Sequence, residues 1–240
     1  MASSSSSDLD RLADDIRACR ICVERPDGAP LPHEPRPVLR VSATARLLIA
    51  GQAPGMRVHK SGLPFDDPSG DRLRMWLGMD REAFYDTRRV CIVPMGFCFP
   101  GYDANGGDLP PRKECACAWH DLLFERLPQV DIVLAIGGYA HRYHFARLGL
   151  PLAKAAKVDE VVRRWREFSD AKPRLFPLPH PSWRNTGWLK RNPWFEAEVL
   201  PDLRAVAAKA TSPPERSKIA EEQRREAEND QSAEQRQHQR

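Results

Sequence analysis

Long apolar runs are missing from this chain. No window of its 240 residues approaches the roughly 18 apolar residues that a membrane-spanning helix needs, so we expect no membrane partner. At the N-terminus, five serines follow Met1-Ala2, and this segment lacks the apolar core of a secretion signal. We therefore expect a cytoplasmic protein whose thiols stay reduced or bind metal rather than pair as disulfides.

A strong excess of charge is missing as well. The net charge is +4, a mildly basic balance that suits nucleic acid but is also common among other enzymes. The chain has no G-x-x-x-x-G-K-S/T loop, which argues against an unrelated nucleotide-binding α/β enzyme. With 41% hydrophobic residues, the chain can build one sizeable core without disulfide support.

Four short apolar runs predict strands: residues 46–50, 90–93, 131–136 and 174–178. The segments between them have helical spacing or cap signals. This alternation predicts an α/β fold, a three-layer α/β/α domain with a central four-stranded, mostly parallel, doubly wound sheet. We expect the domain to span residues 8–210, with a disordered N-terminus (residues 1–7) and a disordered polar tail (residues 211–240).

Two segments carry the most informative pattern. The first apolar run stops at a tight turn, Gly51-Gln52-Ala53-Pro54-Gly55, and the last run leads into His180-Pro181-Ser182. Ligands of parallel α/β sheets bind just beyond the carboxyl ends of the strands. Both segments are therefore expected at the edge of the sheet where a ligand would bind.

Together, the turn 51–55 and the later segment 180–182 resemble the two signature motifs of the uracil-DNA glycosylase superfamily. Their spacing, and Phe65, are similar to the family 4 and family 5 branches, and the resemblance covers most of the chain at the scale of one domain. It implies a monofunctional DNA repair glycosylase of base excision repair. Such an enzyme hydrolyses the N-glycosidic bond of uracil, or of a related deaminated base, in DNA and leaves an abasic site.

A protein of another class stays open at this point. It is a non-catalytic protein on the same fold that binds uracil-containing DNA or abasic sites. Ala53 motivates this alternative, because the best-known glycosylase branch has an Asp at that position. Uracil-containing DNA is the expected partner in either case, and the sequence gives no sign of an obligate protein partner.

The resemblance implies a carboxylate beside the sugar, but this chain departs from some relatives. Family 4 has a Glu where this chain has Gln52, while family 5 uses an Asp just before a Ser-Gly-Asp. The segment Asp67-Pro68-Ser69-Gly70-Asp71 resembles the family 5 arrangement. We therefore expect Asp67 to activate water or stabilise the sugar cation, with Asp66 as the second choice. Alternatively, the two acids merely cap the following helix.

Other site residues follow from the same resemblance. His180 would donate a hydrogen bond to the base carbonyl on which negative charge accumulates, and Phe65 would stack on the base. The expected catalytic residues are Asp67, His180 and Gln52, and the expected base-binding residues are Phe65, Ala53, Gly51 and Asp66. Many relatives have an Asn at the position of Pro94, so the backbone of residues 94–97, or Asn105, would have to read the base edge.

DNA contact is expected from the segment after His180, which in the superfamily enters the minor groove. Apolar wedges flanked by basic residues suit that task. The expected DNA-binding residues are Ser182, Trp183, Arg184, Lys190 and Arg191, and Trp183 or Leu189 would fill the place of the extruded base. We expect Trp194 to pack against the body of the protein instead.

The cysteines form a further pattern. Cys19 and Cys22 make a C-x-x-C pair, and Cys98 and Cys115 bracket a long loop. This layout resembles that of the 4Fe-4S cluster in families 4 and 5, with Cys117 as an alternative to Cys115. Zinc would use the same residues, and unligated thiols are the third possibility.

Overall fold

The computed structural model describes residues 2–212. Nearly all of the predicted polar tail lies outside the described residues. The described chain is built around one sheet with the strand order β2-β1-β3-β4. The strands are β1 (Leu47–Ala50), β2 (Val90–Ile92), β3 (Ile132–Ile136) and β4 (Arg174–Leu178). Every pair of neighbours in this sheet is parallel, so the sheet predicted to be mostly parallel is wholly parallel.

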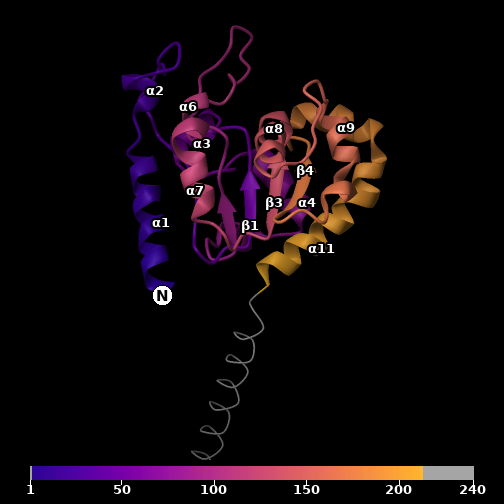
Figure 1. Cartoon of the computed structure of the whole chain (residues 1–240). Coiled ribbons are helices and arrows are strands. Elements are labelled where there is room, and N and C mark those ends of the chain that lie inside the picture. Colours follow the sequence, from indigo (N-terminus) through magenta and orange to yellow (C-terminus); the bar gives the residue numbers. More distant parts are fainter. Residues whose placement is uncertain (1, 213–240) are drawn as a thin grey trace, which may run out of the picture.

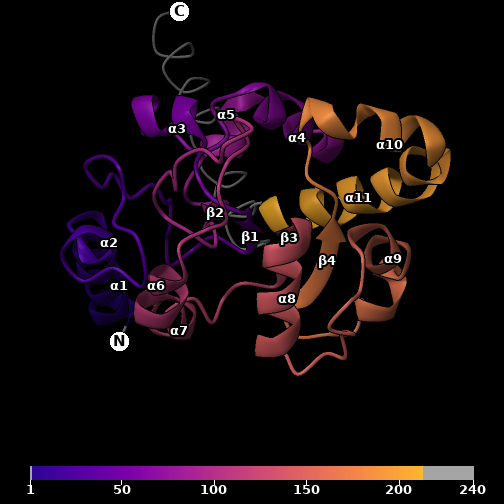
Figure 2. The same ribbon diagram turned by 90° about the horizontal axis from the view of Figure 1, so that it is seen from above.

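Helices cover both faces of the sheet, which confirms the three-layer α/β/α fold (Figures 1 and 2). One face is covered by α1 (Ala2–Arg17), α7 (Asp121–Glu125) and α8 (Gly137–Arg147). The other face is covered by α4 (Pro68–Leu77), α5 (Arg81–Tyr85) and α11 (Leu200–Thr211). Side chains alternate along β1, so Leu48 packs into the first core and Leu47 and Ile49 into the second. Burial of both faces explains why the strands are continuous apolar runs.

Several helices differ from the sequence prediction. Helix α1 begins at Ala2, so it includes the serine run that we expected to be disordered. The helical segment after residue 111 is divided into α6 (Lys113–Cys115), a π-helical turn η1 (Ala116–His120) and α7. The last helical segment is a π-helical turn η4 (Phe195–Val199) followed by α11.

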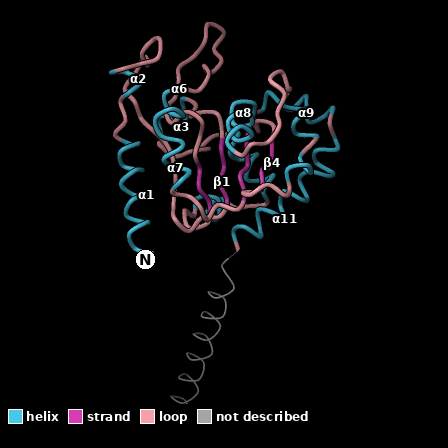
Figure 3. Tube along the Cα trace, in the orientation of Figure 1, coloured by secondary structure: helices cyan, strands magenta, loops and turns pink. Residues whose placement is uncertain are grey.

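Short elements complete the described chain. They are α2 (Ile21–Glu24), α3 (Met56–Ser61), α9 (Val158–Arg163), α10 (Thr186–Arg191) and the 3-10 turns η2 (Trp165–Phe168) and η3 (Trp183–Asn185). The segment between β2 and α6 is a long loop that projects beyond the sheet (Figure 3). Among residues 2–212, no helix is both long and apolar enough to cross a membrane.

The strand order fixes the place of the site. From the central strand β1 the sheet continues to β2 on one side and to β3 on the other, which makes the carboxyl end of β1 a topological switch point. The turn 51–55 follows β1 at this point, and His180 follows β4 at the same edge. The two motifs of the sequence are thus brought to one end of the sheet.

Candidate active site

A cavity lies at the carboxyl edge of the sheet. Its inner part has a volume of about 80 Å³ and includes Gly51, Phe65 and Pro94 in its lining. A wider outer hollow of about 510 Å³ is lined by rim residues such as Tyr102 and Trp183. The residues that line both parts are Gln52, Ala53, Asp67, Ser69, Asp108 and His180.

The turn after β1 is held by the loop after β2. The carbonyl of Gly51 accepts a hydrogen bond from the Met95 N–H at 2.9 Å, and the carbonyl of Gln52 accepts one from the Gly96 N–H at 2.9 Å. These bonds continue the parallel ladder past the end of the sheet. They fix the backbone of Gln52 and Ala53, two of the expected site residues, at the cavity wall.

Phe65 forms another wall, in a conformation that its surroundings impose. Its φ of 57° is in the left-handed region, which bulky residues rarely adopt. A Cβ on Gly70 would lie 1.8 Å from the Phe65 carbonyl oxygen, so only glycine fits there. The Phe65 ring packs against Gly51 and meets Phe84 edge-on at a centroid distance of 6.1 Å. Such a held, strained conformation is typical of a functional site.

The hydrogen bonds of His180 define its tautomer. The backbone N–H of Ser182 donates to Nδ1 at 3.2 Å, so Nδ1 is an acceptor and Nε2 carries the proton of the neutral ring. Burial lowers the pKa of His180 below its usual range, although the negative charge of Asp67 opposes that shift. Asn185 donates to the His180 carbonyl at 2.7 Å and holds the segment in place. His180 is therefore a neutral hydrogen-bond donor at the cavity.

Asp67 caps a helix and also lines the cavity. It is the N-cap residue of α4, and its Oδ1 accepts hydrogen bonds from the Gly70 N–H at 2.9 Å and from the Ser69 hydroxyl at 2.6 Å. The same side chain lines both parts of the cavity. The capping and the site interpretations of this carboxylate are thus compatible, because one oxygen makes the cap.

Asp66 lies elsewhere. Its carboxylate is 3.0 Å from Arg81, and the hydrogen bond from Arg81 lowers the pKa of Asp66. It is absent from the lining of both parts of the cavity. Asp66 thus lies outside the lining of the cavity and pairs with Arg81, so the structure gives no support to the prediction that it contacts the base.

Asp108 is the residue that the sequence reasoning missed. It lines both parts of the cavity, and its Oδ2 would be 3.6 Å from a Cβ on Gly55. Asp108 is exposed, but its partial removal from water raises its pKa, as does the nearby charge of Asp67, while Arg184 opposes the shift. The available signal was only the length of the loop after β2, since loops of that length are usually functional or disordered.

A small hairpin presents Asp108 to the cavity. Tyr102 and Asp108 form an antiparallel bridge. Below the tip, the Asp103 N–H donates to the Gly107 carbonyl at 2.7 Å, and Asp103 Oδ1 accepts from the N–H groups of Asn105 and Gly107 at 2.8 Å each. These bonds give the loop a defined shape. Asn105 is exposed at its tip and is not part of the lining.

Exposed aromatic rings stand at the mouth of the outer hollow. Trp183 is 72% exposed and Tyr102 is 53% exposed, and both line the hollow. The Arg184 guanidinium lies 5.9 Å from the centroid of the Trp183 ring. Arg72 of α4 holds this segment by donating to the Ser182 carbonyl at 2.8 Å and to the Thr186 hydroxyl at 3.0 Å. Aromatic rings beside cations are suited to stack bases and bind phosphates.

The other expected DNA-binding residues differ in position. Lys190 and Arg191 are exposed on α10 but do not line the hollow. Leu189 packs against the core, which leaves Trp183 as the exposed apolar side chain of this segment. Trp194 packs against Trp188 with 5.9 Å between ring centroids, as expected for a structural residue.

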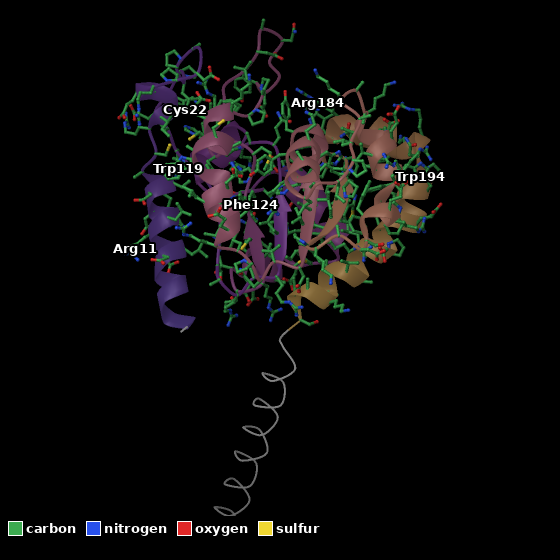
Figure 4. The ribbon with its side chains drawn as sticks, in the orientation of Figure 1. Arg11, Cys22, Trp119, Phe124, Arg184 and Trp194 are labelled. Carbon is green, nitrogen blue, oxygen red and sulfur yellow. The ribbon has the colours of Figure 1, made fainter. Side chains whose placement is uncertain are left out.

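Four cysteines gather beside the loop after β2. Cys22 and Cys98 share one small buried cluster, and Cys115 lies close enough to Cys22 to lower the pKa of the Cys22 thiol to about 7. The Trp119 Nε1–H donates to Cys19 Sγ at 3.3 Å, and the Phe97 N–H donates to Cys115 Sγ at 3.4 Å. Cys22 and Trp119 lie on the side that α1 covers, and Cys22 and Arg184 are at the same end of the molecule (Figure 4).

The arrangement favours Cys115 over Cys117. Cys115 is buried, whereas Cys117 is exposed. Within the described part of the chain, no group of three or more potential ligands is placed ready to hold a metal ion. N–H donors directed at sulfur suit the electron-rich thiolates of an iron–sulfur cluster. The residues therefore fit a 4Fe-4S cluster.

Fold and site together define an α/β protein with a neutral histidine, an aromatic wall and carboxylates at the carboxyl edge of a parallel sheet. The family model described as Uracil DNA glycosylase superfamily matches residues 40–204, and the chain belongs to this superfamily. A similar protein is the Type-4 uracil-DNA glycosylase of Sulfurisphaera tokodaii, which is 23% identical over 186 residues that make up 72% of this chain and 74% of the relative. The resemblance in the sequence motifs is thereby confirmed.

Proposed function

We propose that this protein is a monofunctional DNA glycosylase that hydrolyses the N-glycosidic bond of uracil, or of a related deaminated base, in DNA. The observation that carries the proposal is the placement of neutral His180 and the Asp67 carboxylate around one cavity walled by Phe65. No lysine lines that cavity in the described chain, which supports water rather than an amine as the nucleophile. The name of the S. tokodaii relative supports the same activity.

The geometry suggests how these residues act. The nucleotide is extruded from the DNA stack, and its base enters the inner cavity against the Phe65 ring. As the bond between C1′ and the base breaks, its electron pair leaves with the base. His180 Nε2–H then donates a hydrogen bond to the base oxygen on which charge develops. The negative charge of Asp67 stabilises the cationic sugar until water adds to C1′ and gives an abasic site.

Recognition of the base edge differs from the Asn-based pattern of many relatives. Pro94 lines the inner cavity and offers no side-chain hydrogen bond. Its carbonyl already accepts from His120 Nε2 at 3.1 Å. A pocket that recognises a base by its shape would accept more than one deaminated base. We therefore include hypoxanthine and xanthine among the substrates to be tested.

DNA would be held at the rim of the outer hollow. Trp183 is the proposed wedge, Ser182 and Arg184 line the hollow beside it, and Lys190 and Arg191 extend the basic surface along α10. Tyr102, in the loop between β2 and α6, adds a second exposed ring. Stacking on such rings tolerates every base, because each base has a π-face.

A 4Fe-4S cluster is proposed at the four buried or half-buried cysteines Cys19, Cys22, Cys98 and Cys115. When bound, it would supply iron–thiolate bonds that cross-link the N-terminal segment to the loop after β2. That loop also holds the active-site turn through Met95 and Gly96. The proposed role is therefore structural, and no chemical step on the sugar passes through the cluster.

The function is tested by strand cleavage in alkali, with purified protein and a single-stranded oligonucleotide that carries one uracil. We expect cleavage by the wild type and a large loss with Asp67→Asn. Binding of the oligonucleotide without cleavage of uracil, hypoxanthine or xanthine would contradict the proposal and favour a non-catalytic protein that binds lesions in DNA.

A further inference from the structure

Two carboxylates of unequal character face the cavity. Asp67 has one oxygen committed to the α4 cap, where it accepts hydrogen bonds from Ser69 and Gly70. These bonds fix the position of the Asp67 carboxylate and leave only its second oxygen free.

Asp108 is in the opposite situation. Asp108 is exposed. Its partial removal from water and the neighbouring charges of Asp67, Asp103 and Arg184 determine its pKa, and no hydrogen bond from a described residue contributes. Both of its oxygens are therefore available to a water molecule. The hairpin of residues 101–109 holds the side chain at the boundary of the inner and outer parts of the cavity, where the sugar of an extruded nucleotide would enter.

We propose that Asp108 is the general base that takes the proton of the attacking water, while Asp67 remains the anion beside the sugar cation. This inference rests on the proposed function and deepens it, because it divides between two residues a task that the sequence motifs assign to one. Acid–base roles are typically separated in this way when two carboxyl groups have different environments.

The bond between C1′ and the base nitrogen breaks, and the base leaves as an anion that His180 stabilises. The oxygen of water forms a bond to C1′, and one of its protons passes to a carboxylate oxygen of Asp108. The protonated Asp108 then returns this proton to the departing base, either directly or through solvent. The products are the neutral base and an abasic sugar.

Arg184 connects this chemistry to DNA binding. Its positive charge stabilises the ionised form of Asp108 in the free protein. When Arg184 pairs with a phosphate of the DNA, that stabilisation weakens and Asp108 becomes a stronger base. The basicity of Asp108 is therefore expected to rise when the substrate is bound.

The test compares Asp108→Asn, Asp108→Glu and wild type in single-turnover cleavage as a function of pH. We expect the rate of wild type to fall in acid as Asp108 is protonated. Asp108→Asn should lower the rate by about 10²–10⁴-fold and abolish this acid limb. Asp108→Glu should restore part of the rate together with the limb. Affinity for DNA with an uncleavable abasic analogue should stay within about threefold, which is a small change in binding free energy.

Asp103→Asn is the matched control, because it removes the same charge from the same hairpin and keeps the oxygen that accepts from Asn105 and Gly107. It should retain the rate and an acid limb, which moves slightly to lower pH because the charge of Asp103 raises the pKa of Asp108. An Asp108→Asn variant with the wild-type rate and acid limb would overturn the inference, as would one with a wild-type rate but a changed preference among bases. A wild type that releases no base at all would overturn the proposed function itself.

Discussion

The backbone N–H of Ser182 donates a hydrogen bond to Nδ1 of His180 over 3.2 Å. Because Nδ1 accepts this bond, the proton of the neutral ring is on Nε2. Burial lowers the pKa of the same ring, so the His-Pro-Ser motif produces a neutral donor rather than a cation. The His-Pro-Ser segment thus sets the position and the tautomer of a ring that lines the cavity.

The first prediction concerns that donor. His180→Ala should lower the cleavage rate by roughly 10²–10³-fold, as is typical when one donor to a developing anion is removed. Affinity for DNA containing an uncleavable abasic analogue should change little, because the base that His180 contacts is missing from it. Single-turnover kinetics and a binding titration measure the two quantities. A rate within threefold of wild type would remove His180 from the mechanism.

Asp67 allows capping and catalysis to be separated. Asn is as good an N-cap residue as Asp, whereas Ala costs about 1 kcal/mol of stability. Asp67→Asn should therefore keep the free energy of unfolding and lose the cleavage rate, and Asp67→Ala should lose both. Denaturant unfolding and single-turnover cleavage of the two variants provide the comparison. Equal rates of cleavage in wild type and Asp67→Asn would mean that Asp67 only caps α4 and takes no part in cleavage.

Acid stability depends on buried histidines. Burial lowers the pKa of His144 well below its usual value and that of His141 to about 4. The unfolded chain therefore binds more protons than the folded one, and stability should fall as the pH drops below about 6.5, the usual value for histidine. Both ring nitrogens of His144 lack a hydrogen-bond partner in the described chain. His144→Leu should consequently reduce the pH dependence, which thermal unfolding between neutral and acidic pH would measure.

Much of the fold follows from local sequence, because its elements are determined by burial pattern and turn residues. The strand at residues 174–178 has the predicted bounds, and the apolar runs at β1 and β3 are buried throughout. His180 and Asp67 could be found because each lies directly next to a strand or helix end. The α/β/α arrangement needed only the alternation of these elements.

Tertiary contacts determine what the sequence left open. Asp66 and Asp67 are adjacent, but the chain directs one to Arg81 and the other to the cavity. Cys115 and Cys117 are two positions apart in a helical segment, so they face different directions. Asp108 reaches the site because a hairpin folds over the edge of the sheet. No local sequence pattern predicts this fold of the loop.

The salt dependence of DNA binding tests whether the rim of the outer hollow contacts phosphates. If Arg184 binds a phosphate, Arg184→Ala should weaken binding to all DNA sequences and reduce the slope of log K against log salt by about 0.7–0.9. Arg166 is a suitable control, since it pairs with Glu198 and is not part of the cavity lining. Arg166→Ala should keep the wild-type slope. Equal slopes for all three proteins would exclude a phosphate contact of Arg184.

The cysteines give the last prediction, which has internal controls. Cys19→Ser, Cys22→Ser, Cys98→Ser and Cys115→Ser should each lose iron and the visible absorbance of a cluster, since each removes one thiolate ligand. Cys117 is exposed, and Cys91 is buried within β2. Cys117→Ser and Cys91→Ser should therefore keep the iron content of wild type.

Iron analysis and absorbance spectra of anaerobically purified protein make the comparison. Loss of iron from Cys117→Ser with retention in Cys115→Ser would reverse the assignment of the fourth ligand, and zinc in place of iron in the wild type would contradict the cluster.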